Sequence, residues 1–347
     1  MRRFAIAGLM LASLAGCGGT QATTPNGGST PGGADDPGST NAANDLGSTA
    51  TDDGGGVAGG GGDLATGGPS GPLTPNQKAV AEAMTSIWEN DTPILDYAYS
   101  ENIKDGRGYT SGRAGFCTGT GDAIQVIDCY DKLRSSANGN LMAKYMPALT
   151  TINDKYNSTG QDQGDTSLLD AVGNWVNDWG ASYNTTTTRT DFKKCQDQVS
   201  DLLYYTPAMQ AAMQVGLVTA LTRAALYDMW INQGDDTLVK QTNTALGVKT
   251  AIGVGNTVTE DAWLQKFIEL RRDTLAADST WKTSVDRVAG YEKARRRGNW
   301  DLSKPVDSAV KAKQCWPTGG YLDSQYTSWV INPDGSSAKT TMATACQ

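Results

Sequence analysis

Residues 86–122 read SIWENDTPILDYAYSENIKDGRGYTSGRAGFCTGTGD, and this stretch holds the two carboxylates around which the rest of the chain is organised. Glu89 and Asp105 lie 105 − 89 = 16 residues apart. Glu89 is expected at the end of a helix beside Trp88, whereas Asp105 opens a turn that contains two glycines. Two carboxyl groups in such different settings can hold different protonation states at one pH. We therefore take this pair as the candidate chemical centre of the chain.

The helix before Glu89 has a predicted start and a predicted end. Thr74 is followed by Pro and, three positions on, by Gln77, a pattern typical of a capped helix with Thr74 as the N-cap. Pro93 disfavours helical backbone at the residue before it, so the helix should end close to Glu89. Glu89 then lies near the negative end of the helix dipole and beside Trp88, and both effects raise its pKa. A raised pKa suits a general acid, although a solvated glutamate in a last turn is the commoner case.

Asp105 opens the run DGRGYT, in which two glycines allow a sharp turn. An Asp before Gly is usually only a turn former. The density of polar and aromatic side chains around it favours a binding role. Six such residues fall within twelve positions: Tyr99, Glu101, Asp105, Arg107, Tyr109 and Thr110. This mixture is typical of polar and stacking contacts to a sugar. The glycine-rich run that follows, GFCTGTGD at 115–122, lacks the Lys and the Ser/Thr of a phosphate loop, so we exclude nucleotide binding there.

These motifs resemble the catalytic region of the glycoside hydrolase family 46 chitosanases. Three pieces carry the resemblance in the family's order: Glu-Asn at 89–90, DGRGYT at 105–110 and GFCTGTGD at 115–122. A weaker similarity extends from Thr74 to Asn332. The resemblance implies a two-lobed, lysozyme-like fold with a substrate cleft between the lobes. The helical period of the apolar residues independently predicts a mainly α fold.

The resemblance also implies a reaction: endo-acting hydrolysis of β-1,4 bonds between D-glucosamine residues of chitosan, with inversion of the anomeric configuration and no cofactor. Glu89 matches the general acid, Asp105 the general base, and Thr110 the residue that helps to hold the attacking water. Four further positions match residues that support the cleft or contact glucosamine: Tyr99, Glu101, Arg107 and Asp122. Unpaired carboxylates at Glu101 and Asp122 would attract the protonated amines of chitosan.

A charged cluster is expected behind the acid. The segment from Thr206 to about Gly234 is apolar on nearly all faces, which predicts the longest helix, buried at the centre of the fold. Asp228 lies late in this segment and needs a partner, because a bare buried charge is costly. Arg271 falls on the apolar face of a helix expected from Thr259, and Arg287 lies between apolar neighbours. The family keeps an Asp and two Arg behind its acid at matching positions; an ordinary structural salt-bridge cluster would look the same.

The N-terminal residues predict export and a lipid anchor. Residues 1–16 contain two arginines, a short apolar run and a lipoprotein cleavage box, so Cys17 is the expected lipidation site of a bacterial envelope protein. A signal peptide cut elsewhere is the alternative. Residues 17–73 then form a tether too poor in apolar side chains to fold, residues 74–335 the catalytic domain, and residues 336–347 a C-terminal extension. The protein is expected in the envelope, at the cell surface or released from it.

Composition excludes several classes of function. The formal net charge is −8, of which the first 73 residues contribute −4 (two Arg against six Asp) and the remainder −4 (27 basic against 31 acidic residues). This mild acidity disfavours nucleic acid and suits a cationic ligand. The chain has no histidine, which excludes Ser-His triads and His-based metal sites, and its cysteine spacing does not suit zinc. We expect a monomer without metal or cofactor.

Five cysteines follow Cys17. In an exported protein we expect disulfides, with Cys129 paired to Cys195 and Cys315 to Cys346, which would leave Cys117 as a free thiol; other pairings stay open.

Two other functions remain alternatives. A lysozyme-like peptidoglycan hydrolase would share the fold, but acidic subsites suit an anionic cell wall poorly. A carbohydrate-binding surface lipoprotein with a decayed site would keep the motifs without the activity.

Overall fold

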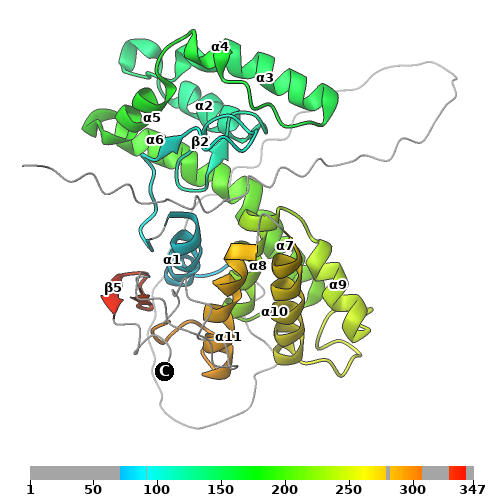
Figure 1. The fold of residues 1–347 in the computed structure, drawn as a ribbon. Coiled ribbons are helices and arrows are strands. Elements are labelled where there is room, and N and C mark those ends of the chain that lie inside the picture. The colour runs from blue at the N-terminus through cyan, green and yellow to red at the C-terminus, as the bar shows by residue number, and fades with distance from the viewer. Residues whose placement is uncertain (1–70, 91, 279–281, 307–327, 341–347) are drawn as a thin grey trace, which may run out of the picture. The chain divides into compact units, whose positions relative to one another are not determined.

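The fold is built almost entirely from helices (Figure 1). The computed structural model describes residues 71–90, 92–278, 282–306 and 328–340, so the expected signal segment and nearly all of the tether lie outside it. The α-helices are α1 (Pro75–Asn90), α2 (Asp122–Leu133), α3 (Met146–Thr159), α4 (Ser167–Asp170), α5 (Trp175–Asn184), α6 (Thr186–Ser200), α7 (Thr206–Val215), α8 (Ala220–Gln233), α9 (Thr237–Leu246), α10 (Glu260–Ala277) and α11 (Ala289–Arg296). Within the described ranges, no helix combines the length and the hydropathy that crossing a bilayer requires.

Shorter elements connect the α-helices. The strands are β1 (Ser100–Glu101), β2 (Thr110–Ser111), β3 (Phe116–Cys117), β4 (Ser328–Ile331) and β5 (Ser337–Thr340), and the irregular helices are three 3-10 helices (Ser136–Asn138, Ala143–Tyr145 and Lys282–Val288) and one π-helix (Asp201–Tyr205). Strands β1, β2 and β3 form an antiparallel sheet in chain order. The expectation of a mainly helical fold is confirmed.

Helix α1 begins with the predicted capping box. The backbone N–H of Thr74 donates to Gln77 Oε1 at 3.0 Å, and the backbone N–H of Gln77 donates to Thr74 Oγ1 at 3.3 Å. Two of the N–H groups that a helix start leaves unpaired are thereby satisfied. The predicted end is confirmed as well, since α1 stops at Asn90 and places Glu89 in its last turn.

The predicted long central helix is wrong: it is two helices. Gly216 ends α7 with φ = +81°, and the next N–H, that of Leu217, turns back to the carbonyl of Ala212. Only glycine takes this backbone conformation at little cost, so the break is fixed by the sequence. The Thr219 side chain then caps α8, and the carboxylate of Glu260 accepts hydrogen bonds from the backbone N–H groups that precede α8. Thirteen of the fourteen residues of α8 are buried, so the central buried helix is α8 alone.

The helices pack in two groups (Figure 1). Helix α6 packs against α2 and α5, and the three-stranded sheet contacts α2 and α5. In the second group α8 packs against α1, α7 and α11, and α10 packs against α9 and α11. The π-helix Asp201–Tyr205 runs directly from α6 into α7 and contacts α6, α7 and α8, so it joins the two groups. Helix α1, which carries Glu89, and the sheet, whose β1–β2 loop carries Asp105, therefore belong to different groups.

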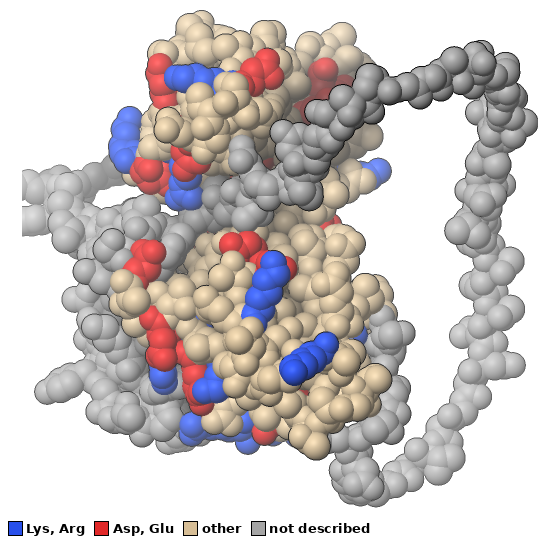
Figure 2. All heavy atoms as spheres, turned by 90° about the vertical axis from the view of Figure 1, so that its right-hand side faces the viewer, with Lys and Arg blue, Asp and Glu red and all other residues tan. Residues whose placement is uncertain are grey.

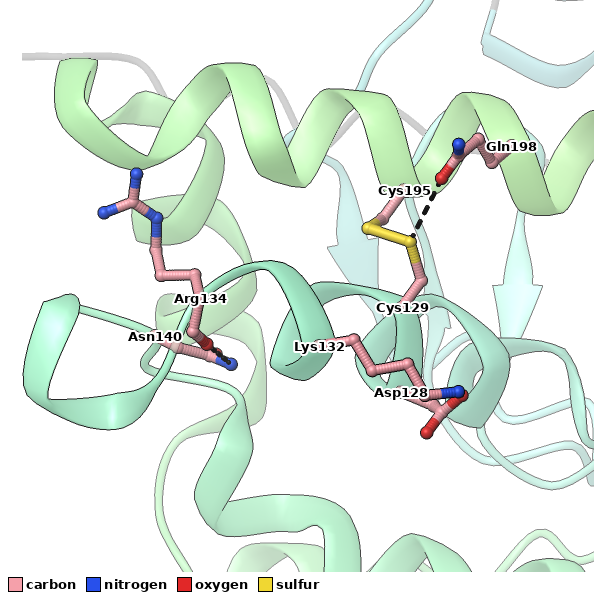
Figure 3. The surroundings of a disulfide bond; sticks show 7 residues. All are labelled: Asp128, Cys129, Lys132, Arg134, Asn140, Cys195 and Gln198. Atoms are coloured by element: carbon pink, nitrogen blue, oxygen red, sulfur yellow. Dashed lines mark hydrogen bonds and ion pairs between the residues drawn. A yellow bond between two sulfur atoms is a disulfide. The ribbon is translucent and has the colours of Figure 1, made fainter. Parts of the chain in front are cut away.

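One disulfide ties α2 to α6 (Figure 3). Cys129 and Cys195 are bonded, with their Cα atoms 5.6 Å apart, which confirms the predicted pair. The prediction of a free thiol at Cys117 is wrong, because Cys117 is also disulfide-bonded. The sequence around Cys117 has no pattern that indicates a disulfide bond. The predicted bond between Cys315 and Cys346 lies outside the described residues.

A C-terminal hairpin extends the fold beyond the expected domain boundary at residue 335. Strand β5 begins at Ser337 and pairs along its length with β4, so the two strands on either side of that boundary form one unit. Ile331, fully buried in β4, exchanges backbone hydrogen bonds with Val306. The hairpin also contacts α1.

Candidate active site

Glu89 is a buried carboxyl group at the end of α1. Its side chain is 4% exposed, and its Oε1 accepts a hydrogen bond from Arg287 Nη2 at 2.5 Å. Burial raises the pKa of Glu89, and this effect outweighs the opposing attraction of Arg287. The predicted direction is confirmed, but loss of solvent around the carboxyl group is the main cause.

Asp228, Arg271 and Arg287 form a buried charged network behind Glu89. Arg287 Nε donates to both carboxylate oxygens of Asp228, at 3.0 and 2.9 Å, while Arg271 Nη1 lies 2.7 Å from Asp228 Oδ2. The three side chains are at most 2% exposed. The two guanidinium groups outweigh burial and lower the pKa of Asp228. The structure thus brings together all three residues that the sequence analysis placed behind the acid.

Each member of this network comes from a different element. Asp228 lies in α8, Arg271 on the buried side of α10, and Arg287 in the 3-10 helix Lys282–Val288. Arg271 Nε also donates to Gln233 Oε1 at 3.2 Å, next to the end of α8. Arg287 bridges Asp228 and Glu89, so the orientation of the Glu89 carboxyl group depends on side chains 139 and 198 positions further along the chain.

Asp105 lies in the loop between β1 and β2 and is held by its own neighbour. Arg107 donates to Asp105 Oδ2 through Nε at 2.9 Å and Nη2 at 2.5 Å, and its backbone N–H donates to Oδ1 at 3.1 Å. The Asp105 side chain is 6% exposed. Three donors from one residue fix the plane of the carboxylate. Arg107 therefore acts directly on the candidate base, a closer role than the cleft support inferred from sequence.

The three-stranded sheet positions the remaining candidates around the Asp105 loop. Thr110 in β2 is paired with Glu101 in β1 and with Cys117 in β3. Its hydroxyl, 3.6 Å from Cys117 Sγ, is buried. Glu101 is exposed and accepts a hydrogen bond from Tyr99 Oη at 3.3 Å, and burial raises the pKa of Tyr99 to about 12.

Asp122 differs from the expected unpaired cleft carboxylate. It is 4% exposed at the start of α2, and its Oδ2 accepts a hydrogen bond from Tyr204 Oη at 3.2 Å. Burial raises the pKa of Asp122 to about 7, although hydrogen bonds from Tyr204 and other donors lower it. Tyr204 belongs to the π-helix that joins the two helix groups, so Asp122 ties α2 to that junction. Its partner is 82 residues away, which explains why sequence reasoning missed it.

Arg113 was also missed, although it lies within the opening stretch of sequence. Its guanidinium contacts Glu82 at 2.7 Å and Asp197 at 2.6 Å, and its side chain is 2% exposed. A lone Arg in a glycine-flanked turn carries no pattern that marks it as buried.

The charges on the face drawn in Figure 2 do not form a patch of one sign, since acidic and basic side chains lie interspersed there.

The pKa of Glu89 predicts how stability depends on pH. A carboxyl group whose pKa is raised by folding loses its proton more readily in the unfolded chain than in the folded protein. Glu89 therefore lowers the free energy of unfolding as the pH rises above 4.5, the ordinary pKa of a glutamate. Glu89→Gln should therefore gain stability relative to wild type as the pH rises from 4.5 towards the raised pKa, by about 1.4 kcal/mol for each unit by which that pKa is raised. Urea unfolding at several pH values measures the difference.

Glu292→Gln is the matched control of opposite sign. Arg295 and Arg296 overcome burial and lower the pKa of Glu292, so this variant should lose stability relative to wild type as the pH rises through the lowered pKa towards 4.5. A difference between Glu89→Gln and wild type that stays constant with pH would contradict the raised pKa of Glu89.

Comparisons with known proteins agree with this geometry. The family model for glycosyl hydrolase family 46 matches residues 83–306. A chitosanase of Bacillus subtilis (strain 168) is 35% identical over 247 residues, covering 67% of this chain and 82% of that protein. A chitosanase of Streptomyces sp. (strain N174) is 30% identical over 243 residues, covering 67% of this chain and 78% of its own length.

Solved structures give the same result. A mutant chitosanase from Bacillus subtilis MY002, crystallised with 6 GlcN, is 35% identical with a TM-score of 0.59, over 68% of this chain and 95% of that one. The chitosanase of Gynuella sunshinyii in complex with chitotetraose is 31% identical with a TM-score of 0.57, over 68% and 94%. Since the family model spans well over half of the sequence, and includes both carboxylates and the network behind Glu89, the chain belongs to glycosyl hydrolase family 46.

Proposed function

We propose that this protein hydrolyses β-1,4 bonds between D-glucosamine residues within chitosan chains, with inversion of the anomeric configuration. The observation that carries the proposal is the contrast between its two carboxyl groups. Both side chains are buried and both accept hydrogen bonds from an arginine, but burial raises the pKa of Glu89 despite Arg287, whereas Arg107 donates to both oxygens of Asp105. Relatives named chitosanases and the family's structures with 6 GlcN and chitotetraose support the substrate.

Glu89 supplies the acid. Its raised pKa keeps the carboxyl group protonated into a higher pH range, and Arg287 fixes the orientation of that group through Oε1. The proton passes from Glu89 to the glycosidic oxygen as the bond from that oxygen to C1 breaks. Asp228 accepts two hydrogen bonds from Arg287, so the guanidinium group that orients the acid is itself held from behind.

Asp105 supplies the base. Oδ2 accepts two guanidinium hydrogen bonds from Arg107, whereas Oδ1 accepts one from its backbone N–H, so Oδ1 is the oxygen better placed to accept a proton from water. That water attacks C1 from the face opposite the leaving oxygen, and its proton goes to Asp105. Thr110 helps to hold the water. The water needs room, so the mechanism requires the two carboxyl groups to lie roughly 6.5 to 9.5 Å apart.

The preference for a cationic polymer comes from the exposed carboxylate of Glu101. Glu101 is exposed at the end of β1 and can pair with a glucosamine ammonium group, and Tyr99 Oη beside it can contribute a hydrogen bond. Asp122 is buried with Tyr204 as its partner, so it shapes the site from behind. An anionic polymer such as peptidoglycan would meet Glu101 as a repulsive charge.

Activity on different polymers tests the proposal. Chitosan should release reducing ends, whereas chitin and cell-wall sacculi should release few. Glu89→Gln and Asp105→Asn should each lower kcat by about 10²- to 10⁴-fold, because each removes one of the two proton transfers. Asp128→Asn, on the exposed side of α2, is the control and should keep wild-type activity. High activity on sacculi, or a Glu89→Gln variant that keeps most of its rate, would refute the assignment.

Inversion has its own test. A proton NMR time course on chitosan oligomers should show the α-anomer of the new reducing end first, followed by slow mutarotation. A β-anomer in the earliest spectra would indicate a retaining mechanism with the carboxyl groups only about 5 to 5.5 Å apart.

The N-terminal sequence leads us to propose that the enzyme is exported and lipid-anchored through Cys17. A tether of roughly 55 residues would reach about 40 Å if flexible, enough to hold the catalytic domain away from a membrane. The Cys17→Ala variant should therefore move from the membrane fraction to the soluble fraction, and labelled fatty acid should mark only the wild type. Membrane association that persists in Cys17→Ala would rule out the anchor.

A further inference from the structure

Arg113 forms a second buried charged network, separate from the one behind Glu89. The residue lies in the turn between β2 and β3, and its guanidinium donates to Glu82 Oε1 at 2.7 Å and to Asp197 Oδ1 at 2.6 Å. Its backbone N–H donates to Gln196 Oε1 at 3.1 Å. The two carboxylates lie on α1 and α6, so one side chain connects the sheet to one helix of each group.

A third segment joins the same network. Tyr97 lies in the connection between α1 and β1; its Oη donates to Asp197 Oδ1 at 2.7 Å, and its ring centre is 5.8 Å from the guanidinium of Arg113. The carbonyl oxygen of Tyr97 accepts hydrogen bonds from Trp179 Nε1 and Gln196 Nε2, at 3.1 and 2.9 Å. The connection between α1 and β1 is therefore bound to α5 and α6 at Tyr97, next to Arg113.

The three segments that meet here also carry the candidate chemistry. Glu82 is seven residues, or about two turns of helix, before Glu89 on α1, which is roughly 10 Å along the axis. Arg113 is three residues after Thr110, and the strand β2 that holds Thr110 pairs with β1 to frame the Asp105 loop. Tyr97 is two residues before Tyr99.

Regular secondary structure does not fix Asp105 relative to Glu89. In the described part of the chain between them, only Ser100 and Glu101 belong to a strand. The separation of the two carboxyl groups is therefore set by tertiary contacts, and contacts between α1 and the sheet act on it most directly. The ion pair from Arg113 to Glu82 is such a contact, and it is shielded from solvent on the Arg113 side.

The turn that carries Arg113 has little freedom of its own. Gly112 has φ = +74° and donates its N–H to the carbonyl of Tyr99 at 2.7 Å. A Cβ at Gly112 would lie 2.3 Å from Gln196 Oε1 and 2.8 Å from a ring atom of Trp179, so the turn is pressed against α5 and α6. Any shift of α1 relative to Arg113 is then transmitted to the sheet.

We propose that Arg113 is a positioning residue for hydrolysis: through Glu82 and Asp197 it sets the distance between Glu89 on α1 and Asp105 beside the sheet. This inference rests on the function proposed above. An inverting site is sensitive to such a distance because one water must fit between the base and the sugar. A misplacement of about 1 Å at a reacting centre can cost about 100-fold in rate.

The test compares Arg113→Met with a matched variant, Arg134→Met. Arg134 is drawn in Figure 3. It donates to Asp191 Oδ2 at 3.0 and 2.7 Å and to the carbonyl of Asn138, so it joins the end of α2 to α6. Within the described residues, none of its side-chain hydrogen bonds reaches α1 or the Asp105 loop. Both variants should lower the thermal midpoint. Only Arg113→Met should lower kcat on chitosan, by about 10- to 100-fold, with KM within about threefold of wild type. Assays are run well below both thermal midpoints.

A second variant keeps the inference testable if Arg113→Met does not fold. Glu82→Ala removes the tie to α1 but leaves Arg113 bonded to Asp197, and Lys78 keeps its partner Asp201. It should also lower kcat with little change in KM. Wild-type kcat in either folded variant, or equal losses in Arg113→Met and Arg134→Met, would overturn the role of Arg113. A wild-type enzyme without activity on chitosan would instead refute the proposed function.

Discussion

The hydrogen bond from Arg287 to Glu89 is the contact on which the rest of the site depends. A carboxyl group can act as an acid at mild pH only if its surroundings favour the protonated form, and burial at the end of α1 does so. Burial alone would leave the group free to rotate. The guanidinium of Arg287 fixes the rotation but favours the charged form, so the two requirements oppose each other. Asp228 eases this conflict, because it shares the positive charge of Arg287 and adds to the rise in the pKa of Glu89.

The fold can be understood as the support for that network. A buried carboxylate and two buried arginines are expensive unless they neutralise one another, and they need rigid elements to stay within ion-pair distance. Helix α8 supplies the carboxylate and is buried on all sides, while α10 supplies Arg271 and the 3-10 helix Lys282–Val288 supplies Arg287. The break at Gly216 matters here, because it lets α8 take its own direction after α7. A single long helix would have tied Asp228 to the direction of α7.

Sequence patterns predicted the features that depend on neighbouring residues. The capping box at Thr74, the end of α1 close to Glu89, the start of α10 near Thr259 and the buried side of α10 all follow from local spacing. Among long-range partners, those of Asp228 were indicated by the family motif, and the Cys129–Cys195 pair was expected only as one of several possible pairings. Nothing local shows that Asp122 is buried against Tyr204, that Cys117 is disulfide-bonded, or that Arg113 reaches Glu82. In each case the deciding contact joins segments that the sequence does not relate to each other.

The acid and the base are held in different ways, and this difference gives the Arg113 network its importance. Glu89 is oriented by residues from three distant elements, whereas Asp105 is oriented by Arg107 two positions away. Arg107 fixes the plane of the Asp105 carboxylate within its loop, but a contact inside a loop cannot place that loop relative to α1. The ion pairs of Arg113 run between the two groups of helices and can do so. Protonation of the acid and its distance from the base are thus controlled by separate buried networks, which allows one to change without the other.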